Sequence, residues 1–165
     1  VVTNHSLLFC DLVADGGLLP PIRYWVVDEA HGAEAEARRV VSVIGDSTFM
    51  HTGVNGIVEM VYNRPATGHV VLILDNSTTA MTGLQEHPGT GRKLDHTPCP
   101  TPVSIEETVK GIGVDNVDVI DAVLDGRGFE ELLKKRLASN DTSVIICRRP
   151  CILAAVKIKS YGEKN

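Results

Sequence analysis

Two nearly continuous runs of apolar residues stand out in the middle of the chain. Residues 40–44 read Val-Val-Ser-Val-Ile, and residues 70–74 read Val-Val-Leu-Ile-Leu. Runs of this kind are typical of strands that are buried on both faces, as they are in a parallel sheet. Between them, residues 51–62 carry apolar side chains at a spacing of three to four, which predicts a helix with one buried face. The residues predicted to form that face are Val54, Ile57, Val58 and Val61.

The alternation of strand and helix patterns continues to the end of the chain. A helix is predicted from an N-cap at Ser104 to residue 112, with Glu107 at the capping-box position. The other predicted elements are strands at residues 1–3, 24–27, 117–120 and 143–147 and helices at residues 33–39 and 129–138. This order predicts an α/β fold in which a mainly parallel sheet is flanked by helices on both faces.

Two further patterns suggest close contacts or function. Residues 75–103 are rich in Thr, Gly, Pro and Asn, and a loop of this length inside a domain is usually functional or disordered. Gly53 and Gly56 lie in the helix predicted at 51–62, where each glycine costs about 1 kcal/mol relative to alanine. Their presence predicts that the helix backbone lies close to a ligand or to a neighbouring strand.

Composition narrows the possible classes of function. The 165 residues are enough for one domain with its own core. The formal net charge is -5 with no basic block, so binding of nucleic acid through a positive face is not expected. No apolar run has the length of a membrane span. Four cysteines without metal-binding spacing predict reduced thiols and a cytoplasmic location. They are Cys10, Cys99, Cys147 and Cys151.

Oxygen-bearing side chains follow both of the central strand patterns. Asp46 comes shortly after the first, and Asp75 and Asn76 come directly after the second. The carboxyl ends of parallel strands meet at one edge of the sheet, where open α/β proteins bind their ligands. A carboxylate, an amide and a backbone carbonyl are oxygen donors that suit Mg²⁺. The pattern therefore predicts a site for a metal-bridged diphosphate, and the alternative is that Asp46 only caps the helix that follows it.

Longer motifs around these residues carry a resemblance to a known family. Gly45-Asp46-Ser47-Thr48-Phe49-Met50-His51-Thr52-Gly53 and Leu74-Asp75-Asn76-Ser77-Thr78-Thr79-Ala80-Met81-Thr82-Gly83 resemble the thiamine diphosphate signature of 2-oxoacid:ferredoxin oxidoreductases. Two more segments resemble the alpha subunits of indolepyruvate:ferredoxin oxidoreductases in particular. They are Gln85-Glu86-His87-Pro88-Gly89-Thr90-Gly91 and Val144-Ile145-Ile146-Cys147-Arg148-Arg149-Pro150-Cys151. The resemblance covers roughly residues 40–155.

The resemblance implies a role for individual residues. It implies that Asp46 and Asn76 bind Mg²⁺ through side-chain oxygens and that Thr78 binds it through its backbone carbonyl. The implied cofactor-binding residues are Gly45, Asp46, Ser47, Thr48, Asn76, Thr78, Thr79, Met81 and Thr82. His87 either reaches the substrate side of the site or bonds to its own turn, and both readings remain open. The other histidines of this region, His51, His69 and His96, are expected to be at the surface or structural.

The resemblance also implies an activity for the full enzyme. That activity is oxidative decarboxylation of an arylpyruvate to an acyl-CoA, with electrons passing through iron–sulfur clusters to ferredoxin. The implied partners are a 2-oxoacid substrate, coenzyme A, ferredoxin, a pyrimidine-binding domain and a second subunit. This sequence contains no cysteine series able to hold an iron–sulfur cluster. The isolated chain is therefore expected to bind the cofactor at best and to be inactive, and its catalytic residues are not assigned.

A second resemblance concerns the first forty residues. Val1-Val2-Thr3-Asn4-His5-Ser6-Leu7-Leu8 and Val26-Val27-Asp28-Glu29-Ala30-His31 resemble DEAH-box helicases of the XPD-like type. This implies that Asp28 would hold the Mg²⁺ of bound ATP and that Glu29 would position the attacking water. The sequence lacks a Walker A loop, so ATP-driven unwinding is not expected.

The two resemblances predict a chain made of unlike parts. We expect a helicase-like fragment at residues 1–39 that is not an independent domain, an incomplete thiamine diphosphate-binding domain at 40–155, and a tail at 156–165. The join near residue 39 is interpreted as either a natural fusion or a misassembled reading frame. The alternative functions are a remnant of an ATP-dependent helicase and a non-catalytic interaction fragment.

Overall fold

The computed structural model describes residues 25–28, 39–64, 67–80, 82–95 and 97–154. Within them, five parallel strands form one sheet in the order β1-β2-β3-β5-β4. The strands are β1 (Trp25–Asp28), β2 (Val40–Gly45), β3 (His69–Asp75), β4 (Asn116–Ile120) and β5 (Thr142–Arg148). The predicted parallel sheet is therefore confirmed. The strand predicted at residues 1–3 and nearly all of the helix predicted at 33–39 lie outside the described residues.

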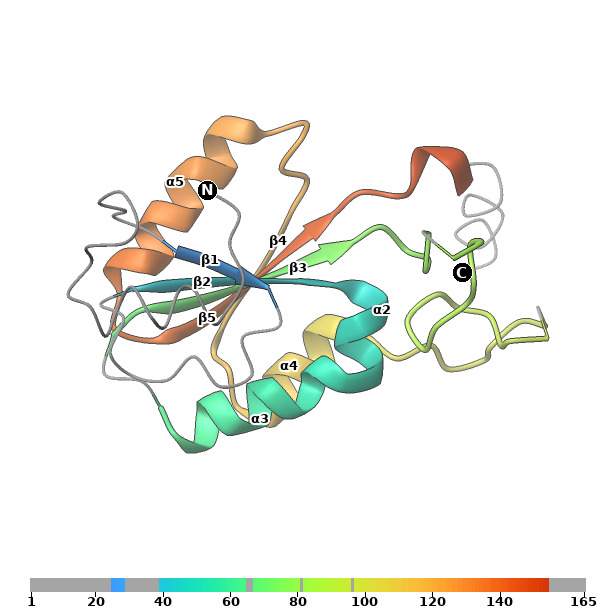
Figure 1. Ribbon diagram of the computed structural model, residues 1–165, viewed down its shortest axis with the longest axis horizontal. Helices are drawn as coiled ribbons and strands as arrows, with labels where there is room; N and C mark the ends of the chain where they lie inside the picture. The colour runs from blue at the N-terminus through green and yellow to red at the C-terminus, as the bar shows by residue number, and fades with distance from the viewer. Residues whose placement is uncertain (1–24, 29–38, 65–66, 81, 96, 155–165) are drawn as a thin grey trace, which may run out of the picture.

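Helices cover both faces of this sheet (Figure 1). One face carries α3 (Val54–Tyr62) and α4 (Ile105–Ile112), and the other carries α5 (Gly126–Ala138). Each layer has its own core, because alternate side chains of a strand point to opposite faces. Buried residues between the sheet and α3 and α4 are Phe49, Ile57, Val71, Ile73, Ile105, Val109, Val114, Val144 and Ile146. Buried residues on the α5 side are Val41, Val70, Leu72, Leu137 and Ile145. The predicted α/β class is confirmed.

The helical segment after β2 begins earlier than the sequence pattern predicts. It runs through α2 (Asp46–Thr48), a π-helical turn η1 (Phe49–Gly53) and α3 without a break. The predicted start at residue 51 was wrong because apolar periodicity does not mark a first turn made of Asp, Ser and Thr. Gly45 is extended at the N-cap, with φ -77° and ψ 154°, so the chain turns into the helix directly at Asp46.

Close packing explains one of the two glycines in this helix. A Cβ on Gly53 would lie 2.6 Å from Cδ1 of Ile44, so the neighbouring strand β2 is the reason for the close approach. The predicted buried face was wrong at Val58, which is 49% exposed. Val58 lies about 100° around the helix from buried Ile57, and Met60 packs against the core instead.

The helices α4 and α5 are both capped by a polar residue at their start. The Ser104 side chain accepts a hydrogen bond from the Glu107 backbone N–H at 3.1 Å, which confirms the predicted N-cap. The left-handed backbone of Gly113, with φ 114°, ends α4. α5 begins at Gly126, three residues before the predicted start, because Asp125 accepts a hydrogen bond from the Gly128 N–H at 2.9 Å.

A buried histidine, His69, is the first residue of β3 and lies at the amino end of the sheet. Nε2 of His69 lies 3.0 Å from the Ser42 hydroxyl of the adjacent strand. Burial lowers the pKa of His69 to about 4. His69 is therefore a structural histidine, as predicted, and His51 is exposed. His96 lies outside the described residues.

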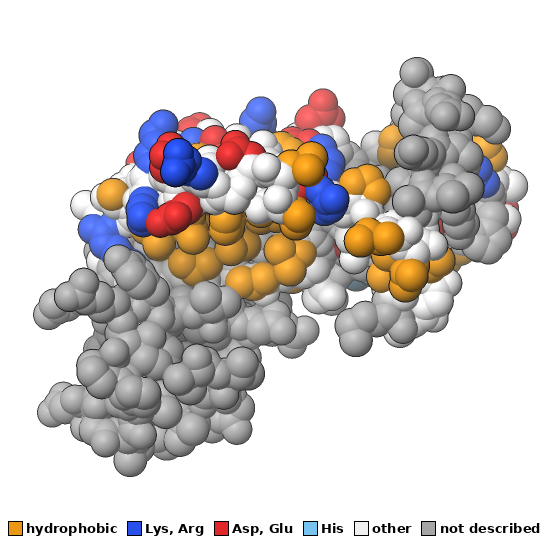
Figure 2. Space-filling model, turned by 90° about the horizontal axis from the view of Figure 1, so that it is seen from above, with side chains coloured by type: hydrophobic (Ala, Val, Ile, Leu, Met, Phe, Trp, Pro, Cys, Tyr) orange, Lys and Arg blue, Asp and Glu red, His pale blue; other side chains and the backbone are white. Residues whose placement is uncertain are grey.

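The face of the molecule that carries α5 has side chains of both charges (Figure 2). Lys134 pairs with Glu130 one turn away, and Arg136 pairs with Asp118 of β4 at 2.7 Å. Hydrophobic side chains form a band beside these charges. This face is therefore not the uniformly positive surface that unspecific nucleic-acid binding uses.

Candidate functional site

The two signature segments lie at the same edge of the sheet. β2 and β3 are parallel neighbours, and Gly45 pairs in register with Leu74. Asp46 and Asp75 are therefore the residues that directly follow this pair. Neighbouring strands of a sheet lie about 4.8 Å apart. α2 begins at this carboxyl edge, and the loop after β3 starts there too (Figure 1). This is the arrangement that the pattern of strands and polar residues predicts.

Asp46 is buried at this edge, and one of its carboxylate oxygens has no hydrogen bond. It is 3% exposed, and its Oδ1 accepts a hydrogen bond from the Ser47 N–H at 2.7 Å. Its Oδ2 has no hydrogen-bond partner among the described residues. A carboxylate oxygen taken from water without compensation is unfavourable by several kcal/mol. The environment of Asp46 therefore fits a carboxylate that binds a cation. A carboxylate that only capped a helix would not require a cation.

Hydroxyl groups join the two signature segments directly. The Thr79 hydroxyl donates to the Ser47 hydroxyl over 2.7 Å, which connects the loop after β3 to the first turn of α2. The Thr78 hydroxyl donates to the Gln85 carbonyl at 3.3 Å, and Thr79 and Gln85 form an antiparallel bridge. The loop therefore folds back on itself beside the start of α2.

Asn76 and Thr78 lie in the turn that follows β3. The side-chain oxygen of Asn76 accepts a hydrogen bond from the Thr78 N–H at 3.1 Å. Ser77 between them has φ 60°, a left-handed conformation that is uncommon outside glycine and is often found at functional turns. The Ser77 N–H donates to Asp75 Oδ1 at 3.0 Å. These contacts hold a compact turn directly at the strand end.

The other residues implied by the resemblance are less closely joined to this centre. Thr48 is exposed in α2, and its carbonyl accepts a hydrogen bond from the Thr52 hydroxyl at 3.1 Å. Thr82 is exposed and hydrogen-bonds with the side chain of Gln85. Met81 lies outside the described residues.

The surroundings of His87 confirm one of the two readings that the sequence left open, its bond to its own turn, and its place on the substrate side stays a prediction. Its Nδ1 accepts a hydrogen bond from the Gly89 N–H at 3.2 Å, so the ring bonds to its own turn. Its Nε2 lies 3.3 Å from Oδ2 of Asp46, so the ring also reaches the site. His87 is 4% exposed. Sequence reasoning did not pair these residues, because the contact spans 41 positions and depends on the path of an irregular loop.

A group of three charged side chains lies beside the turn, and the sequence analysis did not single it out. Arg148 at the end of β5 contacts Asp75 Oδ2 through Nε at 2.6 Å and both Glu106 oxygens through its other two nitrogens, at 2.6 and 3.0 Å. The hydrogen bonds from Arg148 hold the pKa of Glu106 below its ordinary value, and those from Glu106 first and Asp75 second raise the pKa of Arg148. The place of Arg148 at a parallel strand end was the signal that could have found the group.

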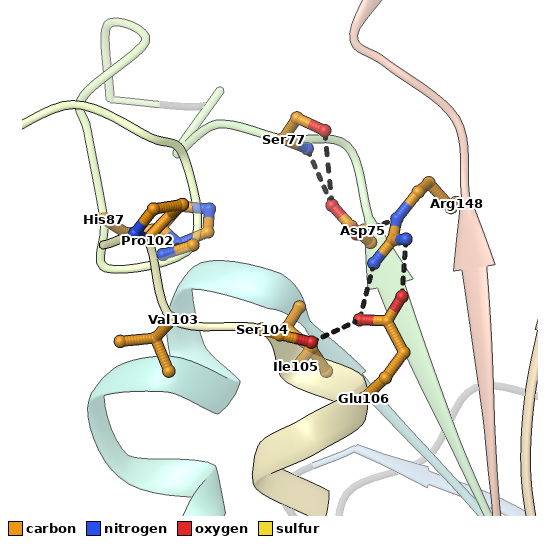
Figure 3. Close-up of a pocket in the computed structure, with 10 residues that line it drawn as sticks. Asp75, Ser77, His87, Pro102, Val103, Ser104, Ile105, Glu106 and Arg148 are labelled. Atoms are coloured by element: carbon orange, nitrogen blue, oxygen red, sulfur yellow. Dashed lines mark hydrogen bonds and ion pairs between the residues drawn. The ribbon is translucent and has the colours of Figure 1, made fainter. Parts of the chain in front are cut away.

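A cavity of about 280 Å³ separates this charged group from the His87 loop. Figure 3 shows His87 and Pro102 on one side, with Asp75 and Arg148 on the strand side and Glu106 at the start of α4. The Asp75 carboxylate is already occupied by Arg148 and Ser77. The carboxylate oxygen that lacks a hydrogen bond at this edge therefore belongs to Asp46 and not to Asp75.

Comparisons with known proteins match the segments that form this edge. Residues 27–147 match the family described as "Thiamine pyrophosphate enzyme, C-terminal TPP binding domain". The chain belongs to this family. Thiamine pyrophosphate is another name for thiamine diphosphate, so the expected cofactor is supported. The matched range contains both signature segments, and it begins within β1, before the boundary predicted near residue 40.

Several curated proteins are similar over most of the chain. It is 41% identical over 126 residues to the indolepyruvate oxidoreductase subunit IorA of Pyrococcus abyssi, which covers 76% of this chain and 19% of that protein. It is 39% identical over 115 residues to IorA of Archaeoglobus fulgidus, covering 70% and 18%. It is 38% identical over 146 residues to IorA of Thermococcus kodakarensis, covering 84% and 21%. The chain thus spans about a fifth of the length of these relatives.

The remaining sequence predictions fare differently. The matches give no support to the helicase resemblance, and the division of the chain at residues 39 and 155 stays a prediction. No helix among the described residues is long and apolar enough to cross a membrane. Within the same residues, no three His, Cys, Asp or Glu side chains gather as a possible metal site. The expected Mg²⁺ ligands include an amide and a backbone carbonyl, so they do not depend on such a cluster.

Proposed function

We propose that this chain is the part of a 2-oxoacid oxidoreductase that holds thiamine diphosphate and Mg²⁺. We infer an indolepyruvate-type enzyme that decarboxylates arylpyruvates oxidatively to acyl-CoA, with ferredoxin as the electron acceptor. Similarity to IorA subunits over 70% or more of the chain supports the enzyme class. The single observation that carries the metal assignment is the buried Oδ2 of Asp46 at the carboxyl edge of β2, which lacks a hydrogen bond among the described residues.

The residues present fit a magnesium–diphosphate group. Asp46 would supply a carboxylate oxygen, Asn76 an amide oxygen and Thr78 a backbone carbonyl, which are the hard oxygen donors that Mg²⁺ prefers. Asn76 and Thr78 share one turn, and the hydroxyl contact between Thr79 and Ser47 connects this turn's loop to α2. The donor set is thus drawn from two adjoining segments.

The start of the helical segment would bind the diphosphate. Backbone N–H groups at a helix N-terminus favour anions, and the unbroken helical run from Asp46 to Tyr62 begins beside the Asp46 carboxylate. Ser47 and Thr48 would add hydroxyl donors. Apart from Gly45 and its chain neighbours, no atom of the described residues lies within 4 Å of the place where a Cβ on Gly45 would be, so the backbone is open to a phosphate there. When bound, thiamine diphosphate supplies the carbon nucleophile for decarboxylation of a 2-oxoacid.

Turnover requires parts that this sequence does not supply. We propose that a pyrimidine-binding domain, iron–sulfur clusters and a second subunit complete the enzyme, and that coenzyme A receives the acyl group. The proposed role of this chain alone is cofactor binding without turnover. We also propose a cytoplasmic location, because the described cysteines, Cys99, Cys147 and Cys151, are free thiols.

Calorimetric titration of the 165-residue chain with thiamine diphosphate tests the proposal. We expect saturable binding that requires Mg²⁺ and that Asp46→Ala weakens at least about 100-fold, because a metal ligand is lost. Glu130→Ala is the matched control, since it removes an exposed carboxylate on α5. Circular dichroism of each variant checks that it is folded. Equal binding by the Asp46→Ala and unsubstituted chains, or binding without a divalent ion, would contradict the assignment.

A further inference from the structure

Two buried polar atoms face each other at the centre of the site, and neither has a hydrogen bond. Nε2 of His87 and Oδ2 of Asp46 are 3.3 Å apart, and both lack a hydrogen-bond partner among the described residues. The two residues are 4% and 3% exposed. Buried polar groups are nearly always satisfied in native proteins, so each exception calls for a cause. Here the two exceptions come as a pair, on segments 41 residues apart.

The hydrogen bond on the far side of the ring fixes which nitrogen carries the proton. The Gly89 N–H donates to Nδ1 of His87, so Nδ1 must be an unprotonated acceptor. The neutral ring then has its proton on Nε2, because one nitrogen of a neutral imidazole donates and the other accepts. That proton is on the nitrogen that faces the carboxylate of Asp46. The ring can therefore act as a donor toward Asp46.

The turn around His87 is built to hold the ring in this place. The His87 carbonyl accepts hydrogen bonds from the Thr90 N–H at 3.0 Å and from the Thr90 hydroxyl at 2.9 Å. The Val103 N–H donates to the Pro88 carbonyl at 3.0 Å, which ties the turn to the segment before α4. His87 and Pro102 both line the cavity (Figure 3). The turn that carries the ring is thus held by its own hydrogen bonds and by the segment before α4.

We propose that His87 is a positioning residue that orients the Asp46 carboxylate for the metal, an inference that rests on the proposed function. The Ser47 N–H fixes Oδ1, and the Nε2–H of His87, 3.3 Å from Oδ2, would fix the rotation of Oδ2 when the metal is bound. A carboxylate has about four lone-pair sites, so one oxygen can accept from His87 and still bind a cation. Outer-shell hydrogen bonds of this kind hold metal ligands in place. The loop that carries His87 is thereby coupled to the metal site.

The opposite role for the ring makes a different prediction. If His87 competed with the cation for Oδ2, removing the ring would tighten metal binding. Positioning predicts weaker binding, because a freely rotating carboxylate must be ordered when the metal binds. The Gly89 hydrogen bond favours positioning, since a doubly protonated ring that replaced the cation could not accept it at Nδ1.

Two substitutions distinguish the contact of the His87 ring with Asp46 from its hydrogen bond to the turn. In His87→Asn the amide can replace Nδ1 toward Gly89 but is too short to reach Asp46. In His87→Gln the amide nitrogen can replace Nε2 toward Asp46. The probe is Mn²⁺ in place of Mg²⁺, titrated into the full 165-residue chain with thiamine diphosphate present. Free Mn²⁺ is measured from its electron paramagnetic resonance signal.

Positioning predicts that His87→Asn weakens Mn²⁺ affinity about tenfold, the usual effect of losing an outer-shell partner. His87→Gln should keep affinity close to that of the unsubstituted chain. Equal or tighter binding by His87→Asn would overturn the role of His87 while leaving the proposed function in place. If the unsubstituted chain shows no saturable Mn²⁺ binding, the proposed function and this role both fail. Nitrogen NMR of the unsubstituted chain gives a second test, because a proton on Nδ1 of His87 would also overturn the inference.

Discussion

The buried side chain of His69 makes the stability of this chain depend on pH. His69 is buried against the adjacent strand, and burial lowers its pKa to about 4 from its ordinary value near 6.5. Above pH 6.5 the ring is neutral in both the folded and unfolded states. Between pH 6.5 and about 4 the unfolded ring binds a proton that the folded ring does not. Stability therefore falls as the pH falls through this window, by about 3 kcal/mol in total.

Denaturant unfolding at pH 7 and at pH 4.5 measures this contribution. We expect His69→Gln to reduce the difference in unfolding free energy between the two pH values by about 2 kcal/mol, because glutamine does not titrate. His51→Gln is the matched control, since it makes the same substitution at a histidine that is exposed in η1. An unchanged pH dependence in His69→Gln would show that another group is responsible.

At the residue scale, the sequence predicted the candidate ligands but not what surrounds them. The place of Asp46 and Asn76 at the ends of neighbouring strands could be predicted, because each follows an apolar strand pattern and parallel strands end at one edge. Their role as metal ligands stays a prediction. The contact of His87 with Asp46 could not be predicted, because it depends on how residues 76–103 fold back without helices or strands of their own. Val58 was wrongly placed in the core because periodicity alone does not fix the centre of the buried face.

At the scale of elements, Arg148 joins β5 to β3 and to α4. It contacts Asp75, which is 6% exposed, and Glu106 at the start of the helix. Arg148→Leu leaves the buried Asp75 carboxylate without its cation, which is strongly destabilising. We expect a loss of about 2 kcal/mol in unfolding free energy, less than for a fully buried pair because the arginine is partly exposed.

Arg149→Leu is the matched control for this loss. Arg149 pairs with Asp121 at 2.9 Å, nearer the solvent, so we expect a smaller loss than for Arg148→Leu. Urea unfolding of both variants at pH 7 makes the comparison. If the two substitutions destabilise the chain equally, the Arg148 group does not have the connecting role that its geometry indicates.

The sheet was easier to predict than the helix boundaries, for a physical reason. Strands buried on both faces, such as β3, leave an unbroken apolar run in the sequence. The start of the helix after β2 leaves none, because its first turn consists of Asp46, Ser47 and Thr48 and is followed by a π-helical turn. Such local irregularities are frequent at functional sites, which is where this one lies.

At the scale of the whole molecule, the described residues form a five-stranded sheet with a polar site at one edge. It belongs to the thiamine pyrophosphate-binding family but spans only about a fifth of its IorA relatives. The function proposed for it is to hold the cofactor. Its β1 strand, before the predicted boundary near residue 40, pairs with β2 as part of the same sheet.

A crystal structure of the chain with thiamine diphosphate and Mn²⁺ tests the central claim most directly. Anomalous scattering locates the metal without assumptions about its ligands. We predict one Mn²⁺ peak about 2.1 Å from oxygens of Asp46 and Asn76 and from the Thr78 carbonyl, with the diphosphate at the start of α2. A bound cofactor whose metal peak lies away from Asp46, or at another edge of the sheet, would contradict the account.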